Sequence, residues 1–265
     1  MPRKKYSLMA SLLSIINENE TDSSSYALAM YLLKNFAKLE KLSIEDTVEA
    51  NFVSTSGVRR FCRSIGYNNF SNMKEDAYEW EYQFKKYIDS AEKFNDRQKI
   101  KEIANNIFQE TDENVDEKMI DHLVDLIRTS TNVVFLASEF SVITIKEFQQ
   151  SLVTFGKIVK IVSSSYVNEE VITSLKENDL LISISITGVY ALNNADVVDK
   201  ANCHKVLITS CDYDALSKQY DEVIRFNIGN DAVDSRIFSK YGIGYLLDLI
   251  FMQYVKRWKE NKECS

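Results

Sequence analysis

The segment from Leu42 to Tyr67, LSIEDTVEANFVSTSGVRRFCRSIGY, constrains the fold more than any other part of the chain. Its pattern predicts two short helices joined by a tight turn. Ser43 and Asp46 have the spacing of a capping box, which starts the first helix. The turn is expected at residues 50–53, directly before a second run of hydroxyl-bearing residues that can cap another helix.

The second of these helices combines an apolar face with a basic one. From Val58, apolar residues recur at i, i+3, i+4 and i+7 as far as Ile65, and Gly66 is placed to end the helix. N-terminal hydroxyls and arginines on the opposite face suit a helix in the major groove of DNA, where they meet phosphates and base edges. An ordinary helical hairpin with a solvated basic face fits the same spacing. The candidate DNA-binding residues are Ser54, Thr55, Ser56, Arg59, Arg60 and Arg63.

The charge of the chain is unevenly distributed. The net charge is −7, but residues 1–90 hold 12 basic and 12 acidic residues, so the negative excess lies entirely after residue 90. A neutral first part with a local arginine cluster is compatible with a double-stranded DNA partner. A length of 265 residues with 45% hydrophobic content is sufficient for two packed domains.

Few residues of the chain are suited to metal binding or disulfide formation. The four cysteines form no CxxC pair and there are only two histidines, so we expect no metal site, no cofactor and no disulfide framework. This cysteine usage indicates a reducing cytoplasm. No segment approaches the ~20 apolar residues needed to cross a bilayer, so we expect no membrane association.

Helical periodicity extends through the first half of the chain and gives way to short β-branched runs after about residue 130. We predict an all-α domain at 1–90, a helical linker at 91–115 and a flavodoxin-like α/β domain at 116–265. Strands that alternate with helices form a parallel sheet, whose ligand site lies between strands 1 and 3. The five expected strands are Val133–Ala137, Lys157–Val162, Asp179–Ile186, Lys205–Thr209 and Val223–Ile228.

Two loops follow strands 1 and 3 of this predicted sheet. The second, Ser185–Tyr190, offers hydroxyls, a glycine and the start of a helix, which together favour an anion. A tight turn capped by Thr187 is the alternative interpretation. Near the C-terminus, an apolar stripe from Ile237 to Trp258 is long enough to cover the sheet and to contribute to a dimer interface.

The segment Val53–Tyr67 resembles the pattern V-S-x-x-T-[VI]-x-R-F-C-[RK]-x-[LI]-G-[YF] of the RpiR/MurR family of bacterial transcription regulators. Phe70 and Met73-Lys74 also fit that family. Gly57 departs from it, because the usual residue there is threonine. The resemblance implies an N-terminal helix-turn-helix domain and a C-terminal sugar isomerase (SIS) domain that senses phosphosugars.

The SIS motifs of that family are only partly present. The family's G-x-G-x-S has become Ala137–Ser141, and its S-x-S-G-x-T has become Ser185–Tyr190. Glu139 stands where a glycine is usual, and a carboxylate ~5 Å from a phosphate would cost ~3 kcal/mol per unit charge. The effector contacts implied by the resemblance are Ser141, Ser185, Thr187, Gly188 and Tyr190.

The resemblance therefore implies a homodimeric or homotetrameric regulator of carbohydrate genes, controlled by a sugar phosphate or related sugar derivative. One alternative keeps the DNA-binding oligomer but gives it an SIS domain that no longer senses a ligand. Another is a sugar-phosphate isomerase, which needs a base. His122 and His204 have no evident carboxylate partner in the sequence, and Glu139 is the only acid near the predicted pocket. We therefore expect no catalytic residue.

Overall fold

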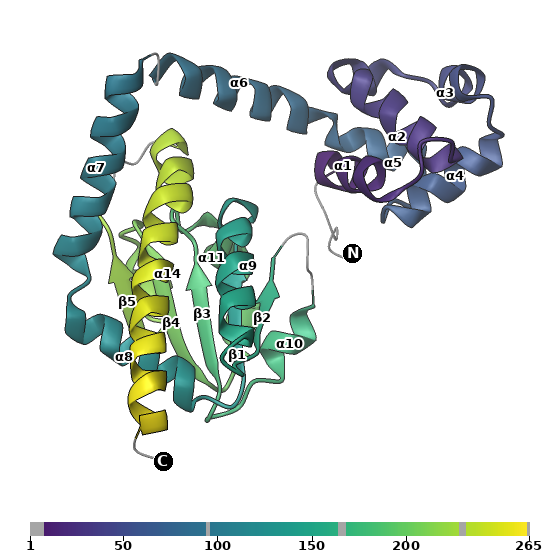
Figure 1. Cartoon of the computed structure of the whole chain (residues 1–265). Coiled ribbons are helices and arrows are strands. Elements are labelled where there is room, and N and C mark those ends of the chain that lie inside the picture. The colour runs from purple at the N-terminus through teal and green to yellow at the C-terminus, as the bar shows by residue number, and fades with distance from the viewer. Residues whose placement is uncertain (1–7, 94–95, 164–167, 228–231, 264–265) are drawn as a thin grey trace. The chain divides into compact units, whose positions relative to one another are not determined.

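A computed structural model describes residues 8–93, 96–163, 168–227 and 232–263 (Figure 1). The chain divides into two compact units, Met1–Lys93 and Phe94–Ser265. The described part of the first unit is helical, and the second is built around a parallel β-sheet. The predicted fold class, an all-α domain followed by a flavodoxin-like α/β domain, is confirmed.

The first unit encloses one hydrophobic core. Leu12, Leu32, Leu39, Phe61 and Met73, each from a different helix, are buried in it. This shared core fixes the helical pair predicted from the sequence against the rest of the unit. The elements are α1 (Leu8–Glu18), α2 (Ser24–Lys34), η1 (Phe36–Lys41), α3 (Ile44–Asn51), α4 (Thr55–Ser64), α5 (Phe70–Lys74), η2 (Glu75–Ala77) and α6 (Tyr78–Lys93).

The second unit contains a five-stranded sheet in which all paired strands are parallel, in the order β2-β1-β3-β4-β5. Every residue of β1 and β3, two of the three inner strands, is buried, as the continuous β-branched runs predicted. The strands are β1 (Val133–Ala137), β2 (Val159–Val162), β3 (Leu180–Ile184), β4 (His204–Thr209) and β5 (Glu222–Arg225).

Strand β3 is shorter than the predicted Asp179–Ile186 at both ends, and the reason for its later start is visible in the preceding turn. The carboxylate of Asp179 accepts hydrogen bonds of 2.8 Å from the backbone N–H groups of Asn132 and Lys176. Asp179 therefore closes the preceding turn, and the strand begins at Leu180. The last residue of the expected fifth strand, 228, lies outside the described residues.

Helices cover both faces of the sheet. Val133 and Phe135 of β1 pack with α7 (Arg97–Asn114), α8 (Glu117–Thr129), α9 (Glu139–Val153) and α14 (Ala232–Glu263), whereas Val134 and Leu136 face the opposite side. This alternation follows from the two-residue period of a strand. The opposite face is covered by α10 (Glu169–Thr173), α11 (Val189–Asn193), α12 (Ala195–Val198) and α13 (Asp214–Ser217).

Helix α7 occupies most of the segment in which we expected a linker. Its Ile107 is buried in the core of the second unit, and α7 packs along α14. Tyr245 of α14 donates a hydrogen bond of 2.9 Å to Asp112 of α7. The helix is therefore part of the second unit. Among the described residues, no helix combines the length and the apolar character required to cross a membrane.

Candidate nucleic-acid interface

Helix α3 begins with the capping box that the sequence predicts. The Ser43 hydroxyl accepts from the Asp46 N–H at 2.9 Å, and the Asp46 carboxylate accepts from the Ser43 N–H at 3.2 Å. The hydrogen bonds from the Ser43 side chain and backbone lower the pKa of Asp46. The helix extends through Asn51, so the turn is shorter than the predicted 50–53 and centres on Phe52 and Val53.

Helix α4 starts and stops where predicted. The Ser54 hydroxyl accepts a hydrogen bond of 3.1 Å from the Gly57 N–H and lies 2.8 Å from the Ser56 hydroxyl. At the other end, Gly66 has a φ of 90°, and the Tyr67 N–H donates to the Cys62 carbonyl. This left-handed closure is typical of a helix that ends on glycine.

One face of α4 is buried and the other is charged. Val58, Phe61 and Cys62 are at most 4% exposed, and burial raises the pKa of the Cys62 thiol to about 11. The charged face carries Arg59, Arg60 and Arg63, all exposed. Within the described residues, none of their guanidinium groups has a carboxylate or hydrogen-bonding partner. These three cations are therefore available to an external anion.

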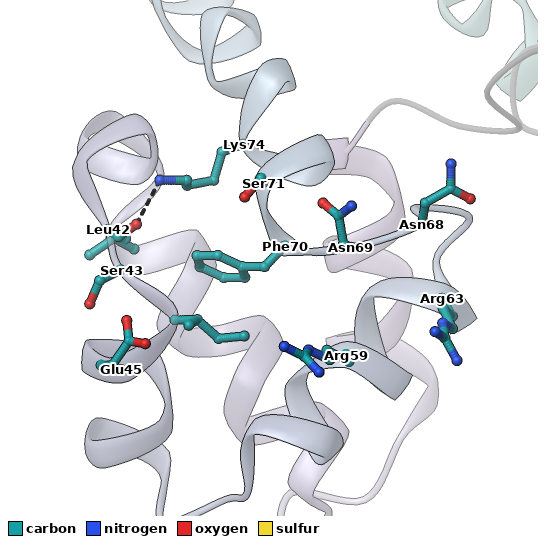
Figure 2. Close-up of a pocket in the computed structure, with 11 residues that line it drawn as sticks. Leu42, Ser43, Glu45, Arg59, Arg63, Asn68, Asn69, Phe70, Ser71 and Lys74 are labelled. Atoms are coloured by element: carbon teal, nitrogen blue, oxygen red, sulfur yellow. Dashed lines mark hydrogen bonds between the residues drawn. The ribbon is translucent and has the colours of Figure 1, made fainter.

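Two of the arginines, Arg59 and Arg63, line a groove of about 650 Å³ on the first unit (Figure 2). The N-terminus of α3 and the segment between α4 and α5 line the same groove. Three lining residues are basic and one, Glu45, is acidic. A positively charged groove beside a helix N-terminus favours a phosphate.

The sequence interpretation missed several residues of this groove. Asn68 and Asn69 reach it from the turn after α4, and Ser43 from the N-terminus of α3 (Figure 2). The Lys74 ammonium donates to the carbonyl oxygens of Glu40 and Leu42 at 3.0 and 2.9 Å, which fixes the chain just before α3. The match of Lys74 to the family pattern was the available signal, but its partners lie more than 30 residues away.

The residues predicted to bind an effector lie on the second unit, after neighbouring strands. Ala137 at the end of β1 pairs with Ile184 at the end of β3, so the loops that follow are adjacent. The buried Ser185 hydroxyl accepts a hydrogen bond of 3.1 Å from the Ala191 N–H, which gives it a capping role. Thr187 is exposed and Tyr190 is half-buried.

Gly188 has a structural reason to be glycine. Its φ is 76°, and an added Cβ would lie 2.7 Å from the Cys211 sulfur. The loop is also held from β4, where the Thr209 hydroxyl donates to the Ser185 carbonyl at 2.8 Å. The sequence interpretation did not identify Thr209 or Cys211, because the loop after β4 contacts the loop after β3 only in the folded sheet.

Ser141 differs from these residues because its hydroxyl is buried and, among the residues that the structure describes, has no hydrogen-bond partner. It lies in the first turn of α9, directly after β1. A buried hydroxyl without a partner is unfavourable, and a bound polar ligand is one way to satisfy it. The side chain of Glu139, whose position decides the repulsion discussed above, lies outside the described residues.

The side chains of the two histidines lie close together at the amino ends of the strands, at the opposite end of the sheet from these loops. The Nε2 atoms of His122 and His204 lie 2.8 and 2.6 Å from the same Glu222 oxygen. Because His204 begins β4 and Glu222 begins β5, this cluster is separated from the effector loops by the length of the strands, roughly 16–20 Å. The described residues contain no group of three or more His, Cys, Asp and Glu side chains placed to hold a metal ion.

Comparison with known families identifies the first unit. Residues 9–83 match the helix-turn-helix domain of the rpiR family. The chain carries an rpiR-family helix-turn-helix domain. The resemblance to this family, which rested on the segment Val53–Tyr67 that contains α4, is thereby confirmed.

Two comparisons cover nearly the full chain. An uncharacterised HTH-type transcriptional regulator in the aarA 3′ region of Providencia stuartii is 20% identical over 267 residues, which are 96% of this chain and 93% of that protein. The structure of Vibrio vulnificus NanR complexed with ManNAc-6P has a TM-score of 0.51 and 18% identity, over 97% of this chain and 94% of that chain. That likeness supports the shared fold.

The sugar isomerase domain of an RpiR transcription factor from Sphaerobacter thermophilus is similar to a smaller part of the chain. The identity is 14% and the TM-score is 0.47, over 60% of this chain and 90% of that one.

Proposed function

We propose that this protein is a DNA-binding transcriptional regulator in which α4 reads the operator. The observation that carries the proposal is the exposed face of α4, where Arg59, Arg60 and Arg63 have no protein partner within the described residues. The opposite face of the same helix is buried in the core, so the backbone that carries the arginines is held in place. Guanidinium groups suit phosphates and guanine edges.

The hydroxyls at the start of α4 complete the reading surface. Ser54, Thr55 and Ser56 are exposed at the N-terminal end of the helix, which is the end that contacts base edges in helix-turn-helix proteins. The groove beside Arg59 and Arg63 then accepts the DNA backbone. We propose that two or four copies of the chain bind together, since half-sites one helical turn apart require paired domains.

The second unit is proposed to sense a sugar phosphate or related sugar derivative and so to control carbohydrate genes. The buried hydroxyl of Ser141 has no partner within the described residues, which favours a polar ligand at the carboxyl ends of β1 and β3. The NanR structure holds ManNAc-6P, and we carry that class of ligand to this chain. A ligand changes DNA affinity only if it binds two states of the protein unequally.

Two observations favour the alternative of a second unit that senses nothing. Ser185 already caps the start of α11, and Gly188 is needed for packing against Cys211. Neither residue therefore requires a ligand to explain it. Ser141 and Thr187 are the residues that this alternative leaves without a role.

Catalysis is disfavoured by the position of the chain's histidines. Isomerisation of a sugar phosphate needs a base within hydrogen-bond reach of the substrate. His122 and His204 pair with Glu222 at the amino edge of the sheet, away from the loops after β1 and β3. We therefore propose a regulator that acts in the cytoplasm and has no enzymatic activity.

The test of DNA binding is an in vitro selection with the full chain and a random duplex library, followed by binding measurements on the recovered duplexes. Replacing Arg59, Arg60 and Arg63 together with alanine is expected to abolish binding. The matched control replaces Arg97, Lys99 and Lys101, three exposed basic residues of α7, and should bind normally. Equal binding by both triple variants would contradict the proposal.

Sensing is tested by a thermal-shift screen with phosphorylated and unphosphorylated sugars, ManNAc-6P included. A ligand at 100 times its dissociation constant stabilises the folded state by about 2.7 kcal/mol. We expect a phosphosugar to raise the melting temperature of the wild type. The absence of any shift across the panel would favour the non-sensing alternative.

A further inference from the structure

Phe52, in the turn between α3 and α4, combines two unusual features. Its side chain is 98% exposed, and its φ is 51°. Among the described residues it is the one non-glycine residue with a positive φ. The ring gains nothing from folding because it stays in water, and a left-handed backbone opposes folding, so the fold itself gives no reason for phenylalanine at this position.

The left-handed conformation itself is required by the way α3 ends. The Val53 N–H donates to the Val48 carbonyl at 3.3 Å, which is the six-residue closure that follows a left-handed residue. Two other helices end with the same closure. Tyr67 donates to Cys62 after Gly66 in α4, and Lys157 donates to Leu152 after Gly156 in α9.

Those two closures use glycine, which adopts a positive φ without steric cost. The closure of α3 uses Phe52 in its place, although glycine would fold there more readily. The exposed ring contributes almost no buried surface to the core of the first unit. Packing and backbone preference therefore both leave the aromatic residue unexplained.

The position of Phe52 next to the N-terminus of α4 indicates what its ring could contact. It lies two residues before Ser54, the N-cap of α4, so the two Cα atoms are at most about 7 Å apart. The N-terminal end of α4 is the end proposed to enter the major groove. An exposed ring at this end is within reach of the apolar parts of DNA, which are the thymine methyl groups and the deoxyribose rings.

We propose that Phe52 is a DNA-contacting residue whose ring packs on an apolar surface of the operator at the edge of the major groove. This inference rests on the proposed DNA-binding function. It explains why phenylalanine stands where glycine would fold more readily. Contact of the ring with DNA stabilises the complex, and this offsets the cost of the left-handed backbone in the free protein. Local strain held at a binding surface is a recognised pattern in proteins.

The test exploits the opposite effects that one substitution should have on folding and on binding. In Phe52→Gly, the closure of α3 becomes like those of α4 and α9, so the melting temperature of the full chain should rise. Its affinity for duplexes selected by the wild type should fall roughly tenfold, the lower end of what burial of a phenyl ring contributes. Phe52→Asn, which also tolerates the left-handed conformation, should weaken binding in the same way.

Two control variants test whether the loss of affinity is specific to the aromatic ring of Phe52. Phe52→Tyr keeps the ring and should bind within about twofold of the wild type, because the apolar face is retained. Ile158→Ala removes another strongly exposed apolar side chain, on the second unit, and should leave DNA affinity unchanged. Circular dichroism of each variant checks that the helices are intact.

Duplexes in which single thymines are replaced by uracil distinguish the two apolar surfaces. If uracil at one position weakens binding by the wild type but does not weaken binding by Phe52→Gly any further, the ring contacts the methyl group of that thymine. If the wild type binds all uracil duplexes as tightly as the thymine duplex, and Phe52→Gly binds all of them more weakly by the same factor, the ring contacts deoxyribose. Wild-type affinity in Phe52→Gly would overturn the inference, and intact binding by the triple arginine variant would instead overturn the proposed function.

Discussion

The hydroxyl of Tyr67 donates a hydrogen bond of 2.5 Å to the Asp76 carboxylate, and both residues are at most 4% exposed. This bond ties the turn after α4 to η2, and so helps to hold α4 in place. In Tyr67→Phe, the buried carboxylate loses a donor, which typically costs about 1–3 kcal/mol. We expect the free energy of unfolding to fall by that amount in urea titrations.

The control for this prediction is Tyr78→Phe, which removes the same hydroxyl from a side chain that is 66% exposed. Its effect should stay within about 0.5 kcal/mol. Equal losses in the free energy of unfolding would mean that the Tyr67–Asp76 hydrogen bond stabilises the fold no more than the exposed hydroxyl of Tyr78 does.

Gly57 costs α4 stability without an evident packing reason. An added Cβ would have the Ser54 hydroxyl as its nearest neighbour, at 3.4 Å, which is an ordinary contact. Gly57→Ala should therefore raise the free energy of unfolding by up to about 1 kcal/mol, the difference in helix propensity. A loss of stability in thermal denaturation would show instead that the Ser54 cap is disturbed.

The sequence predicted the features that depend on near neighbours. The capping box of Ser43 and Asp46 and the stop at Gly66 involve residues a few positions apart, and their local physics identifies them. The alternation of β-branched runs and helices predicted the parallel sheet, and its five strands fitted the flavodoxin-like order. The adjacency of the loops after β1 and β3 then followed from that order.

Contacts over long separations could not be predicted in the same way. Lys74 reaches carbonyl groups 32 and 34 residues away, and His122 meets Glu222 at a separation of 100 residues. The packing of α7 on α14 was missed for the same reason. Periodicity describes which face of a helix is apolar, but it carries no information about the partner that covers that face.

Gly188 provides a prediction about the loop after β3. In Gly188→Ala the new methyl group would lie 2.7 Å from the sulfur and 2.8 Å from the Cβ of Cys211, in a residue with φ of 76°. Overpacking and backbone strain each cost about 1–3 kcal/mol, so the melting temperature should fall clearly. Adding Cys211→Gly should restore part of the loss, because only the clash is relieved. No recovery in the double variant would contradict the contact.

Glu222 predicts a dependence of stability on pH. Burial raises the pKa of this carboxyl, but hydrogen bonds to His122 and His204 outweigh the burial and hold the pKa below its usual range. The ionised form is therefore stabilised by folding. That contribution is complete above the unfolded pKa of about 4.3 and is lost as the pH falls through the lower folded value.

The corresponding variant is Glu222→Gln, compared with the wild type by urea denaturation between pH 7 and pH 3. The wild type should be the more stable protein at pH 7, and the difference should shrink as the pH falls below about 4.3. Because Asp121 and Asp179 also have lowered pKa values, only the difference between the two proteins is informative. A constant difference down to pH 3 would exclude this role of Glu222.

Ser141 separates the sensing and non-sensing alternatives for the second unit. Its buried hydroxyl lacks a partner in the described part of the chain, so Ser141→Ala should raise the free energy of unfolding of the ligand-free protein, by about 1 kcal/mol. If the hydroxyl contacts a phosphosugar, the same variant should lose the thermal shift that this ligand gives the wild type. A variant that is more stable and still responds fully would place the ligand elsewhere. A variant that is less stable would mean that the hydroxyl has a structural partner in solution.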